Sequence, residues 1–461
     1  MQGDVSATPA KSAGTPVLRW LLLLAVLLVA PLILGAAILA WRMWSEHRAV
    51  TRAIEAEESR LQVAGEPITT EELYAFHRVP DGVPDTTAAW LTALHSLDMQ
   101  RFTMEGKGIP IVDLSDRDLL RPDAPGSRFT AAEAFLQAFE PTLQATLDAS
   151  RQPGQCRYPA QFEKGVAELH QGEVQKVRSL VKLLALDARV KVLRADADGA
   201  LQSVAAIFAA SDTLGHQPTM LGQTVRFVTL SMALDEAEYL LGEVDFSAVQ
   251  LSLLQERIAS SDVQGNLTYG LLGERALGLQ AFRQINAPTA APNATGAPAR
   301  PVDCQKYLEL MAESIAASRQ PFPGGRERLQ DFTTQLGANA RSAPPWDQGK
   351  YALTAMVLPS ITSAFDRCAQ AIAKRDVLVT AFAAMRYRLE SHEFPSEITD
   401  LVPDYLSAIP IDPYDGKPLR LQARSGKVVV YSVGKDGKDD NADQNPAGNS
   451  DEPDILIQLS P

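Results

Sequence analysis

The sequence predicts a mainly α-helical protein with one N-terminal transmembrane helix, a helical-bundle ectodomain, and a small C-terminal α+β module. In that module a long helix packs against an antiparallel sheet. Three observations lead to this prediction. Residues 20–40 are apolar and uncharged. Apolar residues recur at helical spacing through residues 130–279. Near the C-terminus, short runs rich in β-branched residues alternate with turn residues.

The uncharged segment at residues 20–40 is typical of a membrane-spanning helix. At about 1.5 Å of rise per residue it extends ~30 Å, the thickness of the hydrocarbon core of a bilayer. Trp20 opens the segment, and Trp41 and Trp44 follow it, where aromatic rings meet the two membrane interfaces. We therefore expect a single-pass anchor over residues 17–44. The alternative is a cleaved signal peptide, whose apolar region is usually ~7–15 residues long.

The helical ectodomain is predicted from an apolar stripe and from a helix-start signal. Thr69 followed by Glu72 forms a capping box, in which each side chain satisfies a free backbone amide of the other residue. No second copy of any helix pair recurs at a fixed period, so we expect an antiparallel bundle rather than a repeat array. The clearest stripe, at spacings of three and four, consists of Val177, Leu180, Val181 and Leu184.

The C-terminal residues predict a long helix followed by a small sheet. An apolar-periodic segment begins after Trp346 and ends near His392. Residues 419–422 and 427–431 read as two strands joined by a short loop, and residues 455–459 add a final strand. We expect the sheet to pack on the long helix.

Four motifs in this region resemble, in order, the globular part of the major pseudopilin of type II secretion systems, a type IV pilin-like family. Residues 385–395 read MRYRLESHEFP, residues 409–419 read IPIDPYDGKPL, and residues 431–437 read YSVGKDG. Asp454-Ile455 supplies the fourth motif. The resemblance implies a pseudopilin-like fold for residues 353–461. Because the pilin-like helix is internal, we expect a module carried by another protein rather than a pilus subunit.

The resemblance also implies a calcium site in the acidic segment after the second strand. The family binds calcium in this loop, and its motif places ligands at Asp436 and Asp454. We add Asp439, Asp440 and Asp443 as candidate ligands because they lie nearby in the sequence. Calcium takes six to eight oxygen ligands, which carboxylates and amides on a flexible loop supply. The alternative is a solvated acidic loop that binds no ion.

These inferences divide the chain into six segments. They are a short cytoplasmic tail (1–16), the anchor (17–44), the helical ectodomain (45–286), a Pro/Ala-rich linker or loop (287–301), a connecting helical segment (302–352), and the pseudopilin-like module (353–461).

Composition and motifs narrow the class of function. The net charge of −13 argues against nucleic acid as a partner, because phosphate binding needs a basic face. Cys156, Cys304 and Cys368 show no CxxC spacing, so we expect three buried thiols. The alternative is one disulfide and one free thiol. The sequence contains no HExxH, GxSxG, Walker or GxGxxG motif. It therefore indicates no particular enzymatic activity, and the question of whether the protein is an enzyme stays open.

The predicted function is that of a single-pass, membrane-anchored interaction or scaffold protein associated with a type II secretion or pilus-like system. Its large C-terminal part is expected outside the cytoplasm at the inner membrane. The expected partners are the lipid bilayer, through the one helix, and envelope or secretion-system proteins. The alternative function is a membrane-anchored extracytoplasmic hydrolase with its site in the helical domain.

Overall fold

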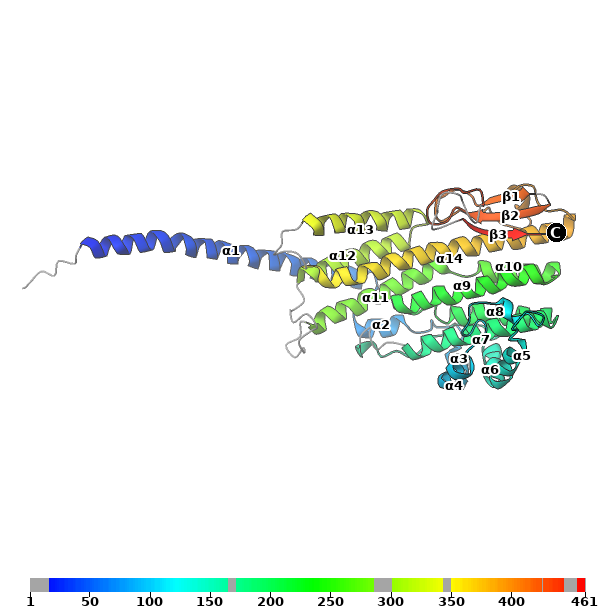
Figure 1. Cartoon of the computed structure of the whole chain (residues 1–461). Helices are drawn as coiled ribbons and strands as arrows, with labels where there is room; N and C mark the ends of the chain where they lie inside the picture. Colours follow the sequence, from blue (N-terminus) through cyan, green and yellow to red (C-terminus); the bar gives the residue numbers. More distant parts are fainter. Residues whose placement is uncertain are drawn as a thin grey trace, which may run out of the picture. The chain divides into compact units, whose positions relative to one another are not determined.

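The computed structural model describes residues 16–164, 171–285, 301–342, 350–424, 426–442 and 454–460. The chain divides into two compact units, Met1–Ser59 and Arg60–Pro461. Helix α1 (Pro16–Val63) accounts for the described part of the first unit and continues into the second. The remaining helices and the sheet belong to the second unit (Figure 1).

The predicted membrane anchor over residues 17–44 is wrong. Among the residues that the structure describes, no helix is both long enough and apolar enough to cross a membrane. Helix α1 has 48 residues. Along its described side chains, however, the apolar run ends at Arg42, and Glu46 and Arg48 follow within two turns.

Helices form most of the second unit. Helices α2 to α8 are Thr70–Phe76, Thr87–Ser96, Met99–Glu105, Phe129–Ala138, Glu140–Ser150, Gln171–Leu193 and Ala197–Asp212. Helices α9 to α14 are Met220–Glu243, Ala248–Ala259, Val263–Ile285, Pro301–Ser318, Gly324–Ser342 and Ala352–Ser391.

The core lies where the long helices pack side by side. Helix α7 contacts α8 and α9, and the stripe Val177, Leu180, Val181 and Leu184 is fully buried there. Helix α14 packs along α9, α10, α11 and α12, so it is the element that joins the bundle to the C-terminal sheet (Figure 1). The predicted capping box is present at α2, where Glu72 N donates to Thr69 Oγ1 at 3.2 Å and Thr69 N donates to Glu72 Oε2 at 3.1 Å.

The sheet has three antiparallel strands in the order β1 (Arg420–Arg424), β2 (Lys427–Ser432), β3 (Ile455–Leu459). The hairpin and the final strand therefore form as the sequence predicts. Val430 pairs with Leu421 on one side and with Ile457 on the other. Strands β2 and β3 both pack on α14. Helix α14 ends at His392, which adopts a left-handed conformation with φ of 64°.

The three cysteines are buried free thiols, as expected from their spacing.

Candidate functional site

The predicted calcium ligands lie around the segment that joins β2 to β3. Asp436, Asp439 and Asp440 follow β2, and Asp454 directly precedes β3. The fifth candidate, Asp443, lies outside the described residues. Turn geometry holds the described part of the segment. Lys438 N donates to Asp436 Oδ1 at 3.0 Å, and Asn441 N donates to Asp439 Oδ1 at 3.0 Å.

Three carboxylate oxygens of this segment are buried and accept no hydrogen bond from the described residues. They are Asp436 Oδ2, Asp440 Oδ2 and Asp454 Oδ1. Lys438 Nζ lies 3.7 Å from Asp436 Oδ2. Burial raises the pKa of Asp454, and the neighbouring carboxylates of Asp440 and Asp439 raise it further. Buried carboxylate oxygens without partners are costly, and a bound cation would satisfy them.

The described residues do not, however, assemble a complete metal site. Within the described parts of the chain, no group of three or more His, Cys, Asp or Glu side chains lies close enough together to hold a metal ion. Carboxylate oxygens such as those of Asp436, Asp440 and Asp454 are ligands that calcium prefers. The calcium site nevertheless stays a prediction.

A second acidic group fixes the turn before β1. The Asp412 carboxylate is fully buried and accepts hydrogen bonds from Arg420 Nη1 at 2.8 Å and from Val433 N at 2.9 Å. Arg420 also pairs with Asp415, and its Nε lies 3.5 Å from Asp439 Oδ2. One guanidinium therefore ties the turn of residues 412–416 to the acidic segment after β2.

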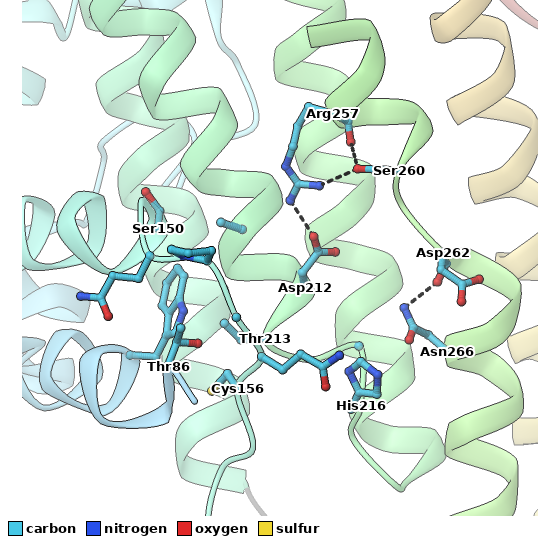
Figure 2. Close-up of a pocket in the computed structure, with 17 residues that line it drawn as sticks. Thr86, Ser150, Cys156, Asp212, Thr213, His216, Arg257, Ser260, Asp262 and Asn266 are labelled. Atoms are coloured by element: carbon cyan, nitrogen blue, oxygen red, sulfur yellow. Dashed lines mark hydrogen bonds and ion pairs between the residues drawn. The ribbon is translucent and has the colours of Figure 1, made fainter. Parts of the chain in front are cut away.

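A polar pocket of about 530 Å³ lies in the helical part of the second unit (Figure 2). Its wall is built from the ends of elements: the start of α3, the loop after α6, the last turns of α8 and α10, and the start of α11. The labelled lining residues are Thr86, Ser150, Cys156, Asp212, Thr213, His216, Arg257, Ser260, Asp262 and Asn266 (Figure 2).

Asp212 connects an accessible arginine of the pocket with a buried one. Arg257 Nη2 donates to Asp212 Oδ2 at 2.6 Å, as Figure 2 shows. Arg226, on α9, is fully buried, and its Nη2 lies 3.6 Å from Asp212 Oδ1. Burial lowers the pKa of Arg226, and Asp212 opposes this shift most strongly. The Asp212 carboxylate therefore pairs with two cations, the buried Arg226 behind the pocket wall and the more accessible Arg257 in the pocket.

Cys156 and His216 share the pocket in forms unsuited to a thiolate nucleophile. Burial raises the pKa of the Cys156 thiol to about 12. Burial also lowers the pKa of His216 to about 4, and the nearby Arg157 and Arg226 cations lower it further. At neutral pH both side chains are uncharged, whereas a cysteine nucleophile needs a depressed thiol pKa. The arrangement is suited to hydrogen bonding.

Sequence reasoning did not identify this pocket. Its residues come from positions 86 to 266 and belong to no spaced motif. The signals at Asp262 and at Ser150 are those of ordinary helix ends, so nothing in the sequence marks them as parts of one site.

No protein-family model matches the chain, and no solved structure matches it. Part of the chain is similar to the type II secretion system core protein G of Pseudomonas aeruginosa, with 29% identity over 110 residues. The match covers 20% of this chain and 77% of that protein. This similarity supports a distant pseudopilin-like module within the chain, and the rest of the chain stays unrecognised.

Proposed function

We propose that this protein is an interaction protein of a type II secretion-like apparatus and that residues 353–461 are its docking module. The observation that carries the proposal is the similarity to the type II secretion core protein G. The four pseudopilin-like motifs all lie in residues 353–461. We place the module outside the cytoplasm, where such an apparatus assembles.

The packing of α14 favours a docking role over a role as a filament subunit. Its first half is buried in the helical bundle through Ile361, Phe365 and Cys368, and its second half carries the sheet. A pilin-like helix that is committed to its own bundle is not free to pack into a filament core. The module therefore offers its sheet and its loops to a partner, and the bundle holds the module in place.

Calcium is part of this proposal. Asp436, Asp440 and Asp454 each contribute a buried oxygen with no hydrogen-bond partner among the described residues. A calcium ion bound beside any of these oxygens would neutralise part of the negative charge of the segment after β2, although the described positions of the three carboxylates do not by themselves gather around one ion.

The test is co-purification from the protein's own cells. The full chain is tagged, the cells are cross-linked, and secretion-system components in the purified material are quantified by mass spectrometry. The proposal expects type II secretion components to be enriched over a control bait carrying the same tag. Enrichment no greater than with the control bait overturns the proposal.

A further inference from the structure

We infer that the pocket shown in Figure 2 binds a neutral polyhydroxylated ligand, a saccharide of one or two rings. This inference goes beyond the proposed function and does not depend on it. The pocket volume of about 530 Å³ lies in the range of small-molecule sites, roughly 300–1,000 Å³. The chemistry of the lining groups determines the class of ligand.

The pocket is held in shape by its own backbone. Gln155 N donates to Pro84 O at 2.9 Å, and Thr86 N donates to Gln155 O at 3.0 Å, so the loop after α6 is fastened to the start of α3. Gly154 lies at this crossing with φ of 142°, and a Cβ there would be 2.3 Å from Pro84 O. Only glycine fits this approach. A preformed wall reduces the ordering cost of binding.

The hydroxyl groups of the wall are available mainly as acceptors. Three of them already donate their single proton to a backbone carbonyl of their own helix, which leaves only their lone pairs. A ligand that contacts them must therefore bring its own O–H or N–H groups. These bonds are Ser150 Oγ to Leu147 O at 2.7 Å, Thr213 Oγ1 to Ala210 O at 2.6 Å, and Ser260 Oγ to Arg257 O at 2.8 Å. Ser260 Oγ also accepts a hydrogen bond from Arg257 Nη1 at 3.3 Å, so one of its two lone pairs is already used.

Other groups add both donors and acceptors. Asp262 is exposed and accepts one hydrogen bond from Gly265 N at 2.8 Å through Oδ1; among the described residues its other oxygen accepts none. Arg257 is a donor, and the neutral imidazole of His216 offers one donor and one acceptor. Each sugar hydroxyl can donate one hydrogen bond and accept others, so a ligand with several hydroxyls matches this mixture of donors and acceptors.

Charge around the pocket is balanced, which disfavours an ionic ligand. Arg257 and Arg226 face Asp212. Asp262 adds a negative charge at the start of α11, where the helix dipole compensates it. An added anion or cation would disturb these pairs, whereas a neutral ligand would leave them intact.

The experiment is saturation-transfer NMR followed by calorimetric titration of the full chain. The probes are D-glucose, D-galactose, N-acetyl-D-glucosamine and maltose, with inorganic phosphate and acetate as ionic probes. The test variant is Asp262→Asn, because asparagine caps a helix as well as aspartate does but lacks the charged acceptor. The matched control is Asp196→Asn. Asp196 caps α8 through Gly199 N at 2.9 Å in the same way and lies outside the pocket.

We expect saturable binding of at least one sugar, about tenfold or more weaker in Asp262→Asn and unchanged in Asp196→Asn. Absence of saturable binding by all four sugars overturns the inference. Equal weakening in both variants overturns it as well, since that result would reflect altered helix capping. Tighter binding of phosphate or acetate than of any sugar, lost in Arg257→Gln, would show an anion site instead. None of these results bears on the secretion proposal.

Discussion

Removal of the Asp412 carboxylate is predicted to destabilise the C-terminal module strongly. The carboxylate is fully buried and accepts four hydrogen bonds. Oδ1 accepts from Tyr414 N at 3.0 Å and from Ser432 Oγ at 2.9 Å. Oδ2 accepts from Arg420 Nη1 at 2.8 Å and from Val433 N at 2.9 Å. The turn, the start of β1 and the end of β2 therefore meet on one carboxylate.

The substitution Asp412→Ala should lower the free energy of unfolding by about 4 kcal/mol. Breaking a buried ion pair by removing one partner costs about 3–5 kcal/mol. The buried Val433 amide would also lose its acceptor, which adds about 1 kcal/mol, while relaxation of Arg420 toward Asp415 recovers part of the loss. Because most domains are stable by only ~5–15 kcal/mol, a loss of this size is large.

The assay is equilibrium urea unfolding of the full chain, combined with hydrogen exchange measured by mass spectrometry. Hydrogen exchange shows where the variant is destabilised, because the backbone amides of the peptide containing β2 should exchange faster while those of the helices stay protected. Asp415→Ala is the matched control: it removes a second carboxylate partner of Arg420 but leaves the buried acceptor in place. We expect it to cost about 1–2 kcal/mol. A loss in Asp412→Ala no greater than in Asp415→Ala would refute the reasoning.

Three further predictions concern the acidic segment and the pocket. Calcium should raise the melting temperature of the full chain, and Asp436→Ala should abolish the rise. At a hundredfold excess of calcium over Kd, the free energy of unfolding should increase by about 2.7 kcal/mol. Iodoacetamide should label Cys156 at pH 8 at least ~1,000-fold more slowly in the native protein than in urea, because burial raises its pKa to about 12. Lowering the pH from 6.5 to 4 should destabilise the wild type more than His216→Gln. The His216 pKa, about 4 when folded, lies below the unfolded value of about 6.5, so the unfolded chain binds the extra proton in this window.

The calcium and pH predictions each have a control within the chain. Asp404→Ala changes an exposed carboxylate of the same module and should leave any calcium response intact. His95→Gln changes an exposed histidine and should keep the wild-type pH dependence. A calcium response that survives in Asp436→Ala, rapid native labelling of Cys156, or equal pH dependence in wild type and His216→Gln would each contradict the structural reading behind it.

Features determined by neighbouring residues could be predicted from the sequence. The Thr69–Glu72 capping box depends on three residues of spacing, and it forms as expected. The hairpin of β1 and β2 depends on a short loop before a strand rich in β-branched residues, and β3 is found at the predicted residues, Ile455–Leu459. In each case the interaction that stabilises the element is encoded within a few positions.

Features assembled across long sequence distances could not be predicted in the same way. The pocket joins Cys156 to Asp262 through the packing of several helices, and each residue alone reads as part of a helix end. Arg226 sits in an apolar-periodic helix, and its burial against Asp212 depends on where α8 ends. The membrane anchor was predicted from local hydropathy at residues 20–40 alone, whereas no helix among the described residues is long and apolar enough to cross a membrane.

The central claim, that residues 353–461 are the part that docks to a secretion apparatus, is tested most directly by cross-linking mass spectrometry. The full chain in its own cells is treated with a lysine-reactive cross-linker, and cross-links to secretion components are mapped. Exposed lysines are present in the module at Lys417, Lys427 and Lys438, and in the helical part at Lys107 and Lys164. The account predicts cross-links from the module lysines to type II secretion proteins. Cross-links to those proteins from Lys107 and Lys164 alone would contradict it.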